Sequence, residues 1–416
     1  MSDHRQKNRV LMIVENCSYL RDPRVRKQAK ALKESGYQVT VISPGSDTLL
    51  WGQLINGVLV YQFPAIQFFD GAFGYFLEYS YATFVIATIM LYVLVIHGFD
   101  VVHVANPPDC LVLVAAIYKW MGKRIIFDQH DLSPELYISK FRRPNRMLVW
   151  LLLLLERLSY KLADHTIVTN ESYRQVAIRR SGRSPSKVTV VRNGPDTECV
   201  EIRDADMELR RRSPHLIAFA GITGHQDGLE YLCRALRSLR FDLGREDFFC
   251  IVLGDGDALS DVKRLTQELD IDEKVWFAGW INDPDLYFRY LSTADICVAP
   301  EPSNIYNDRS TFVKVMDYMA LGKPIVAFDL PETRFSAGSA ALYVCPNNER
   351  EFGLKLAQLM DDAGLRGAMG EAGRRRIQTQ FAWQHSIPDL LAVYGVVDSE
   401  TIVQPLRHGL TPKVQR

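Results

Sequence analysis

The feature that most constrains the fold of this sequence is a regular alternation of short apolar runs and helix-length segments, which restarts once along the chain. In the first half it predicts strands at Val10–Val14, Gln38–Ser43, Val58–Phe63, Val101–Val104, Arg124–Asp128, His165–Thr169 and Val188–Arg192. Beyond a polar stretch at 200–214 it predicts strands at Leu216–Ala220, Phe249–Leu253, Val275–Ala278, Ile296–Ala299, Pro324–Ala327 and Ala341–Val344. Strands that alternate with helices are typical of βαβ units and a parallel sheet. The pattern therefore predicts two α/β domains in succession.

A chain of 416 residues is too long for one ordinary core, which supports this division. We expect a first domain over 1–199, a linker over 200–214 and a second domain over 215–380. A helix over 381–398 is expected to pack back toward the hinge, and the tail over 399–416 is expected to be disordered. Two doubly wound domains joined in this way face a cleft, and ligands bind at the carboxyl ends of parallel strands.

Composition excludes several classes of partner. Lys plus Arg and Asp plus Glu number 49 each, so no overall field attracts nucleic acid. The seven cysteines are dispersed without the spacing of a metal site, which is typical of reduced thiols in a cytoplasmic protein. We therefore expect neither a nucleic-acid partner nor a bound metal. No G-x-G-x-x-G follows the first strand of either domain, which argues against a nicotinamide-dependent oxidoreductase.

The densest group of polar and charged residues lies in the second domain, between residues 299 and 338. A helix is expected to begin near Ser310, where Ser310 and Thr311 would offer hydroxyls and free backbone N–H groups to a diphosphate. Lys314 and Asp317 would follow near one helical face, the lysine for phosphate and the carboxylate for ribose hydroxyls. An ordinary capped amphipathic helix with exposed charges fits the same pattern.

The segment KVMDYMALGKPIVAFDLPE, which begins at Lys314, resembles the donor-binding helix and following strand of the family-4 (group 1) retaining glycosyltransferases. The resemblance runs from Val10 to Tyr394. It implies the GT-B architecture, with two Rossmann-like doubly wound parallel-sheet domains facing a cleft. It also implies transfer of a sugar, with retained anomeric configuration, from a nucleotide diphosphate sugar such as a UDP-sugar, with no metal and no cofactor.

Asp317 takes the second acidic position of the family's E-x7-E motif, which holds the ribose, whereas Arg309 stands at the first. The loop that contains Gly256 also matches the family, and the strand that carries Phe277 resembles the family's strand beside the nucleobase. Residues 255–257 spell Asp-Gly-Asp, a metal-binding signature of another glycosyltransferase fold. Their place after a strand of a βα domain favours a turn instead.

The family commonly has two cations near the first strand of the second domain, and both bind the diphosphate. Ile222 and Asp227 stand in their place, although Gly221 and Gly224 still permit close approach of the backbone. The resemblance therefore implies that Lys314 and the basic residue at the first acidic position supply the charge that neutralises the diphosphate.

In the first domain, His130 and Asp131 directly follow the strand Arg124–Asp128, where parallel-sheet proteins place catalytic groups. The histidine resembles the family's histidine at the cleft and is expected to contact the transferred sugar or the acceptor. A purely structural histidine remains the alternative. Asn106 and Asn170 follow two other strands and are expected on the acceptor side of the same crevice.

The segment Asn16–Arg26 replaces the Gly-Gly loop that many relatives have after the first strand. Arg21 and Arg24 in this segment suggest an acceptor that carries phosphate. Solvated arginines at the start of a basic helix, over Asp22–Ser35, are the alternative reading.

Two apolar blocks of the first domain suggest a membrane surface. Tyr79–Ile96 carries no charge and has roughly the length of a membrane span, whereas Met147–Leu155 follows a basic segment. Cations beside Trp and Leu suit an interfacial helix on an anionic membrane. The residues concerned are Arg142, Arg143, Arg146 and Trp150. We expect monotopic docking at the inner face of the cytoplasmic membrane, with buried core helices, or a true span at Tyr79–Ile96, as alternatives.

Together these features predict a peripheral glycosyltransferase that extends a lipid-linked glycan or polysaccharide in cell-envelope or exopolysaccharide synthesis. A nucleotide-sugar epimerase of the same fold would bind the same donor without a lipid acceptor. A non-catalytic, membrane-associated nucleotide-sugar-binding protein is the third possibility, because the usual phosphate cations are replaced.

Overall fold

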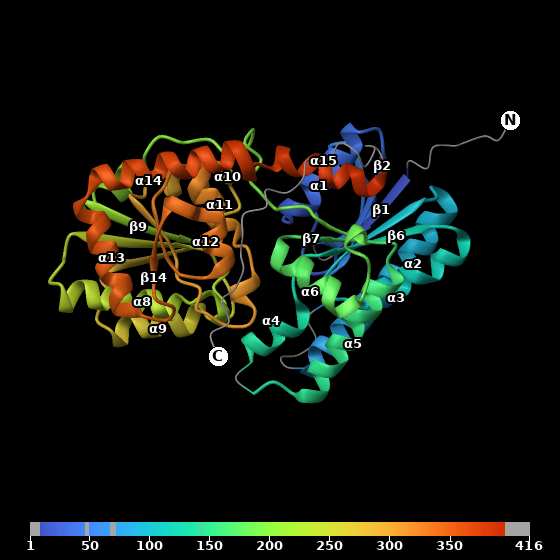
Figure 1. Ribbon diagram of the computed structural model, residues 1–416, viewed down its shortest axis with the longest axis horizontal. Helices are drawn as coiled ribbons and strands as arrows, with labels where there is room; N and C mark the ends of the chain where they lie inside the picture. The colour runs from blue at the N-terminus through green and yellow to red at the C-terminus, as the bar shows by residue number, and fades with distance from the viewer. Residues whose placement is uncertain (1–8, 46–49, 67–71, 142, 396–416) are drawn as a thin grey trace.

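The computed structural model describes residues 9–45, 50–66, 72–141 and 143–395. These residues form two α/β domains that lie side by side (Figure 1). Every strand predicted from the apolar pattern is present, with its ends shifted by at most two residues. The prediction of two doubly wound parallel-sheet domains is confirmed.

The first domain is built on an eight-stranded sheet of order β3-β4-β2-β1-β5-β6-β7-β8. Only β3 runs antiparallel, paired with β4 through a tight Asn56-Gly57 turn in which both residues have positive φ. This hairpin strand was not among the predicted strands. The bounds are β1 Arg9–Ile13, β2 Gln38–Gly45, β3 Leu50–Ile55, β4 Val58–Pro64, β5 Val101–Ala105, β6 Arg124–Gln129, β7 His165–Val168 and β8 Val188–Val190.

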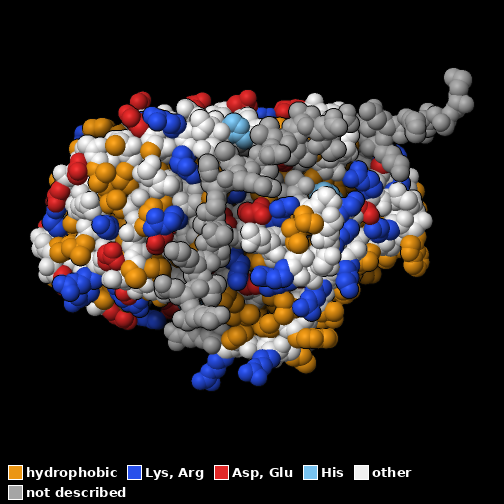
Figure 2. Space-filling view, viewed as in Figure 1, with side chains coloured by type: hydrophobic (Ala, Val, Ile, Leu, Met, Phe, Trp, Pro, Cys, Tyr) orange, Lys and Arg blue, Asp and Glu red, His pale blue; other side chains and the backbone are white. Residues whose placement is uncertain are grey.

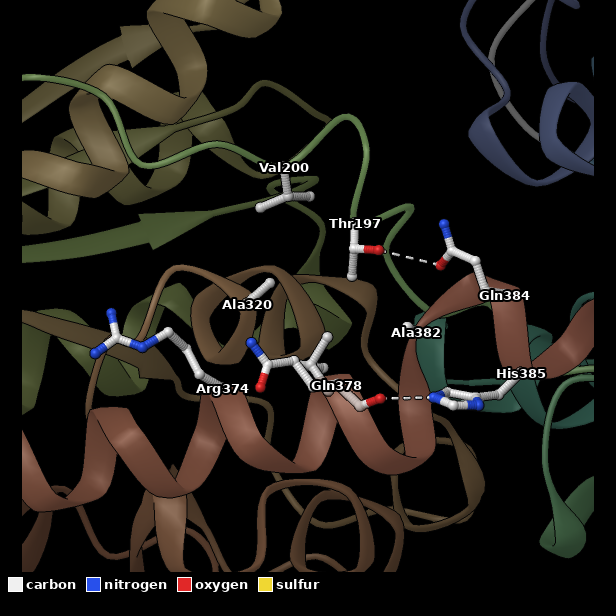
Figure 3. Close-up of a pocket in the computed structure, with 9 residues that line it drawn as sticks. Thr197, Val200, Ala320, Arg374, Gln378, Ala382, Gln384 and His385 are labelled. Atoms are coloured by element: carbon white, nitrogen blue, oxygen red, sulfur yellow. Dashed lines mark hydrogen bonds between the residues drawn. The ribbon is translucent and has the colours of Figure 1, made fainter.

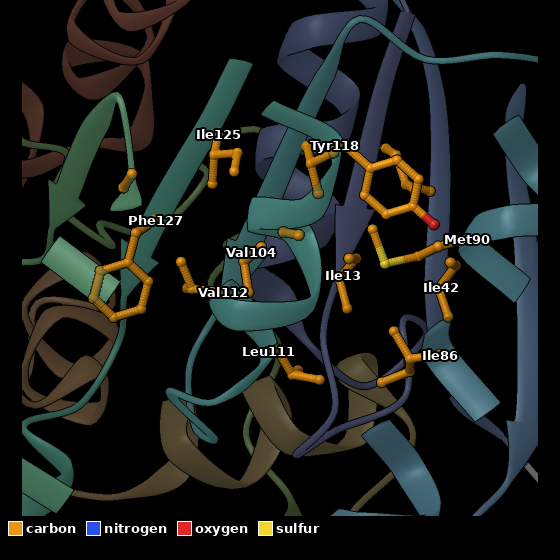
Figure 4. Close-up of a cluster of buried hydrophobic side chains, with 14 of the residues drawn as sticks. Ile13, Ile42, Ile86, Met90, Val104, Leu111, Val112, Tyr118, Ile125 and Phe127 are labelled. Carbon is orange, nitrogen blue, oxygen red and sulfur yellow. The ribbon is translucent and has the colours of Figure 1, made fainter. Parts of the chain in front are cut away.

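Helices cover both faces of this sheet, because side chains of successive strand residues point to opposite faces. One face packs against α1 (Pro23–Glu34), which has Asp22 as N-cap and ends before Gly36, as expected. The other face packs against α2, α3 and α6 and the end of α5, around the buried core shown in Figure 4. The helices of this domain after α1 are α2 Ala72–Ile96, α3 Leu111–Ala116, α4 Ser133–Lys140, α5 Arg146–Leu162 and α6 Glu171–Ser181.

The apolar helix α2 is a crossover between two strands of one sheet. Its stretch Leu77–Ile96 is long and apolar enough to cross a membrane, with a mean hydropathy of 2.0. However, Ile86 and Met90 are buried in the core of the domain, and the flanking strands β4 and β5 both belong to the same sheet. The structure therefore favours a helix packed on the domain over a span, with its outer face exposed.

The second domain has a six-stranded, fully parallel sheet of order β11-β10-β9-β12-β13-β14. Its strands are β9 His215–Ala220, β10 Phe248–Leu253, β11 Val275–Gly279, β12 Ile296–Ala299, β13 Ile325–Phe328 and β14 Ala341–Val344. Its helices are α8 Leu229–Arg237, α9 Leu259–Glu268, α10 Pro284–Thr293, α11 Val313–Ala320, α12 Pro331–Ala337, α13 Glu349–Asp361 and α14 Ala363–Arg376. The stretch expected as a linker includes a short helix, α7 (Met207–Arg210), which Arg210 ties to this domain through Asp295.

The chain passes between the domains twice at nearly the same place. After β8 it runs into the second domain, and after α14 it returns so that α15 (Trp383–Tyr394) packs against α1 of the first domain. Gln384 bonds to Thr197 (Figure 3) and also to Asp196, which joins the two crossings. A cavity of about 430 Å³ lies at this hinge, and none of the predicted site residues lines it.

Candidate functional site

The carboxyl ends of the two sheets face each other, and the domains touch there through polar contacts. Ser139 of α4 bonds to Asn304 at 3.0 Å, and Lys140 forms an ion pair with Asp257 at 2.6 Å. Between these ends lies the loop 301–312 of the second domain, which follows β12. The structure therefore shows a closed cleft in which this loop packs on the first domain.

On the first-domain side, Asp128 at the end of β6 is the centre of a buried polar network. Its carboxylate accepts two hydrogen bonds from Arg24, at 2.7 and 3.1 Å, and others from Gln28 and His130. Burial alone would raise the pKa of the Asp128 carboxyl, but the charges and hydrogen bonds of its partners hold it well below its usual range. The expectation that Arg24 contacts an acceptor phosphate is wrong, because its guanidinium is buried against Asp128.

His130 is oriented by this network. Its Nε2 lies 2.9 Å from Asp128, so that nitrogen carries the proton and donates to the carboxylate. Among the described residues, Nδ1 has no hydrogen-bond partner, and the side chain is 12% exposed. His130 can therefore accept a hydrogen bond from a substrate hydroxyl with this nitrogen.

Asp131 is held from both domains. Its backbone N–H and that of His130 donate to the side-chain oxygen of Asn106, at 3.2 and 2.6 Å. Tyr306, from the loop of the second domain, donates its hydroxyl to the Asp131 carboxylate at 2.5 Å. Burial raises the pKa of the Asp131 carboxyl, and the Tyr306 hydrogen bond opposes this. Asn106 is fully buried, so it shapes the loop from within, contrary to the expected role at the acceptor.

On the second-domain side, Lys314 of α11 lies beneath the turn after β9. A Cβ at Gly221 would stand 2.8 Å from the Lys314 side chain, and Gly221 has a φ of 144° that favours glycine. The Lys314 ammonium pairs with Glu301 at 2.6 Å and with Asp227 at 3.8 Å. Burial raises the pKa of Asp227 to about 6, although Lys314 lowers it. The backbone of the turn at Gly221 therefore lies next to the Lys314 cation, an arrangement that can bind a phosphate.

The expected helix start at Ser310 is wrong, because α11 begins three residues later, at Val313. The Ser310 hydroxyl donates to the carbonyl of Tyr306, and Thr311 contacts Glu332. Both hydroxyls therefore have partners within the protein in the closed cleft. Their positions before the helix are fixed by contacts with the first domain that the sequence pattern does not reveal.

Those contacts come from Asn170 and Tyr173. Asn170 is the N-cap of α6, fully buried, and donates to the Arg309 carbonyl at 2.8 Å and to Thr311 at 3.0 Å. Tyr173 bonds to Ser310 at 3.0 Å. Asn170 is therefore an interdomain contact, not the exposed acceptor residue that was expected.

Arg309 does not lie where a donor phosphate would need it. Its guanidinium donates to the Ile305 carbonyl at 2.5 Å and lies 4.0 Å from Glu135 of the first domain. The expectation that Arg309 shares the diphosphate charge with Lys314 is therefore wrong for this closed arrangement.

The remaining predicted residues lie around the same crevice. Asp317 accepts a hydrogen bond from Tyr287 at 3.3 Å. Burial raises the pKa of Asp317 to about 6, and the charge of Lys27 lowers it. Gly224 and Gly256 belong to the turns after β9 and β10, Phe277 is half-buried in β11, and Arg21 is exposed before α1. Their predicted roles stay predictions.

Comparison with known proteins decides the family. The family model of Glycosyltransferase Family 4 matches residues 24–199, and that of Glycosyl transferases group 1 matches residues 213–362. The chain belongs to the family-4, group 1 glycosyltransferases. The resemblance inferred from the donor-binding segment is thereby confirmed.

Curated relatives are similar over part of their length. The chain is 28% identical over 214 residues to the MMP alpha-(1->4)-mannosyltransferase of Mycolicibacterium hassiacum, which covers 51% of this chain and 49% of that protein. It is 27% identical over 257 residues to the D-inositol 3-phosphate glycosyltransferase of Salinispora tropica, covering 57% and 52%. The chain thus spans about half the length of these relatives.

Solved structures confirm the GT-B fold of this family-4 chain. Sucrose-phosphate synthase of Thermosynechococcus elongatus superposes with a TM-score of 0.72 at 16% identity, over 93% of this chain and 98% of that chain. HepE of Anabaena in complex with UDP-glucose superposes with a TM-score of 0.68 at 15% identity, over 94% and 100%.

Two residues of this family-4 site, Asp128 and Tyr306, were missed by sequence reasoning. Asp128 ends an apolar strand, and its partner Arg24 lies 104 residues away in the chain, so no local signal marks the pair. Tyr306 gives no signal in its own segment, because its partner Asp131 belongs to the other domain.

Proposed function

We propose that this chain transfers a glycosyl group from a UDP-sugar to an acceptor hydroxyl, with retained anomeric configuration and without a metal. The bond between the anomeric carbon and the diphosphate oxygen breaks, and the acceptor oxygen forms the new bond. The acceptor proton passes to the leaving diphosphate. Family membership supports the reaction class, and neighbours such as HepE are described with UDP-glucose.

The single observation that carries this proposal is the position of Lys314 beneath the glycine turn after β9. A cation next to an exposed backbone stabilises charge that develops on the diphosphate as it leaves. Lys314 comes from α11, so it supplies a charge that the family more often takes from the turn itself. Glu301 and Asp227 pair with the Lys314 ammonium, and a diphosphate would compete with these carboxylates for it.

The test is nucleotide affinity. Lys314→Met and Asp317→Asn are each expected to weaken UDP binding, because a hydrogen bond to a charged group contributes about 1.5–3 kcal/mol, roughly ten- to a hundredfold in Kd. Titration calorimetry with UDP measures the change. Lys187→Met, which removes an exposed lysine of the first domain, is the control and should bind UDP normally.

Unchanged UDP affinity in both variants would remove the support for a donor site at α11. UDP binding with no release of UDP from a panel of UDP-sugars would favour the non-catalytic alternative. Conversion of a UDP-sugar to its epimer would favour the epimerase.

We also propose that the first domain docks on the inner face of the cytoplasmic membrane and receives a lipid-linked glycan of cell-envelope or exopolysaccharide synthesis. Large apolar side chains are exposed on α5, on α2 and on the 3₁₀ helix η1 (Ile117–Met121) that follows α3. They include Phe84, Val95, Trp120, Met147 and Trp150. Figure 2 shows apolar side chains gathered along the lower edge of the first domain, around α5.

Charge at the start of α5 suits an anionic surface. Arg143 and Arg146 are exposed beside Met147 and Trp150, as expected for an interfacial helix, whereas Arg142 lies outside the described residues. Apolar side chains would enter the acyl boundary while these arginines meet the anionic headgroups.

Combined substitution of Trp120 and Trp150 by serine is expected to weaken binding to phosphatidylglycerol vesicles by about tenfold or more, since two aromatic anchors are lost. Vesicle sedimentation measures the bound fraction. Trp280→Ser removes a half-exposed tryptophan of the second domain and is the matched control. Equal sedimentation of wild type and the double variant would contradict docking through this surface.

A further inference from the structure

Glu15 is a buried acid that has no partner among the residues the structure describes. It lies two residues beyond β1, at the carboxyl edge of the first sheet, and is 8% exposed. Within the described part of the chain, it makes neither a hydrogen bond nor an ion pair. A buried carboxylate normally has both, because burying it without them lowers the free energy of unfolding.

Two further carboxylates lie at the same edge. Asp109 follows β5, the neighbour of β1, is 3% exposed, and its Oδ2 has no hydrogen-bond partner. Glu78 belongs to α2, which passes over this edge and contacts Cys110 through Thr83. Burial and the charge of Glu78 raise the pKa of Glu15 to about 7. Burial raises the pKa of Asp109 to about 6.

The charged groups that shift the pKa values of Glu15 and Asp109 upward are themselves acidic, Glu78 for Glu15 and Asp131 for Asp109. Burial and the charges of Asp109 and Glu15 all raise the pKa of the Cys110 thiol, which lies in the connection between β5 and α3. Asp131 lies on the far side of Asp109 and raises its pKa. Arg24 of the buried network is engaged with Asp128, and the exposed Arg21 lies near Cys17 in the segment after β1. A phosphate placed directly between Glu15 and Asp109 would therefore meet like charge.

We propose that Glu15, Asp109 and Glu78 form an acceptor subsite that binds the hydroxyl groups of an uncharged sugar ring. The proposal rests on the proposed glycosyl transfer and names the chemistry of its acceptor. Carboxylates accept hydrogen bonds from hydroxyls strongly, and the bound sugar would supply the partners that Glu15 and the Asp109 Oδ2 lack. The expectation that Arg21 meets an acceptor phosphate is separate from this subsite and stays a prediction.

The position of the subsite fits its role. It lies along the same sheet edge as His130 and Asp131, which follow β6, the other neighbour of β5. Helix α2 passes over the subsite, and the outer face of this helix is apolar and exposed. A sugar held between Glu15 and His130 can therefore carry a lipid end that leaves along α2 toward the membrane surface, with its phosphates outside the subsite.

Binding of simple sugars tests the proposal. Saturation-transfer NMR is recorded for methyl β-D-glucopyranoside, methyl α-D-mannopyranoside and glucose 6-phosphate on wild type, Glu15→Ala and Glu34→Gln, an exposed glutamate of α1 as control. We expect at least one uncharged glycoside to bind wild type and the control, and to bind Glu15→Ala about tenfold more weakly. Glucose 6-phosphate is expected not to bind at this subsite.

Three results would overturn the subsite: no uncharged glycoside binds wild type, Glu15→Ala binds it equally well, or glucose 6-phosphate binds in a manner that depends on Glu15. UDP affinity is measured on the same samples. If wild type does not bind UDP, the proposed function fails, whereas failure of the glycosides with UDP bound concerns the subsite alone.

Stability provides a second readout that needs no ligand. The pKa of Glu15 is about 7 in the folded chain against 4.5 for a free glutamate. The Glu15 carboxyl therefore lowers the free energy of unfolding progressively as pH rises from about 4.5 to about 7. Glu15→Gln should therefore raise Tm above pH 7 and leave it unchanged below about pH 4.5. Equal Tm values at every pH would show that Glu15 is compensated in the folded protein, and would overturn the proposal.

Discussion

Replacing His130 with alanine is expected to lower the rate of UDP release from the donor by about 10²–10³-fold, the usual cost of removing one preorganised group that stabilises charge developing in the transition state. Nε2 is fixed on Asp128 and Nδ1 has no partner among the described residues, so Nδ1 is the nitrogen that can contact the transferred sugar. The variant leaves the Asp128–Arg24 pair in place, so Tm should change little. Steady-state UDP release with saturating donor measures the effect.

His97→Ala is the matched control for that experiment, because His97 is an exposed histidine just after α2 and far from the sheet edge. A His130→Ala protein with normal turnover would show that the histidine only supports the fold. A slow variant that has also lost UDP affinity would point to an indirect effect on the donor side.

Replacing Arg24 with methionine is expected to lower the free energy of unfolding by about 3–5 kcal/mol, because it leaves Asp128 buried without its counter-ion. The side chains of the two residues are 3% and 0% exposed, so solvent cannot compensate. Chemical denaturation followed by circular dichroism measures the loss. Arg26→Met on the exposed face of the same helix should cost little.

The Arg24 result also has a pH dependence. The pKa of Asp128 is lowered on folding, so its contribution to stability is present above the ordinary pKa of 3.8 and is lost as pH falls toward the folded value. Wild type and Arg24→Met should therefore converge in stability in strong acid. A constant difference down to the lowest pH would contradict the assigned ion pair.

The sheets could be predicted from the sequence because apolar alternation is a local signal that survives in the folded chain. The strand β3 was missed although Asn56-Gly57 is a strong hairpin signal, because its own apolar pattern is weak. The donor helix was placed three residues early, since Tyr173 and Asn170 hold the preceding loop from the other domain.

The site was predictable where it depends on position along one strand, and not where it depends on pairing between distant segments. His130 and Asp131 could be named because they follow a strand. Arg24 was assigned to an acceptor because its local sequence is basic, whereas its partner lies in β6. Arg309 was assigned to the donor because it stands at the first acidic position of the family's motif, whereas in the structure its guanidinium lies 4.0 Å from Glu135 of the first domain.

The double passage of the chain between the domains limits how the cleft can open. Because both connections lie at one end of the interface and Gln384 joins them, the domains can rotate about that end but cannot separate along it. Rotation therefore moves the far side most, where Tyr306 meets Asp131 and Lys140 meets Asp257. We therefore expect substrate entry to require rupture of those pairs, with water or a sugar hydroxyl taking the place of the Tyr306 hydroxyl at Asp131.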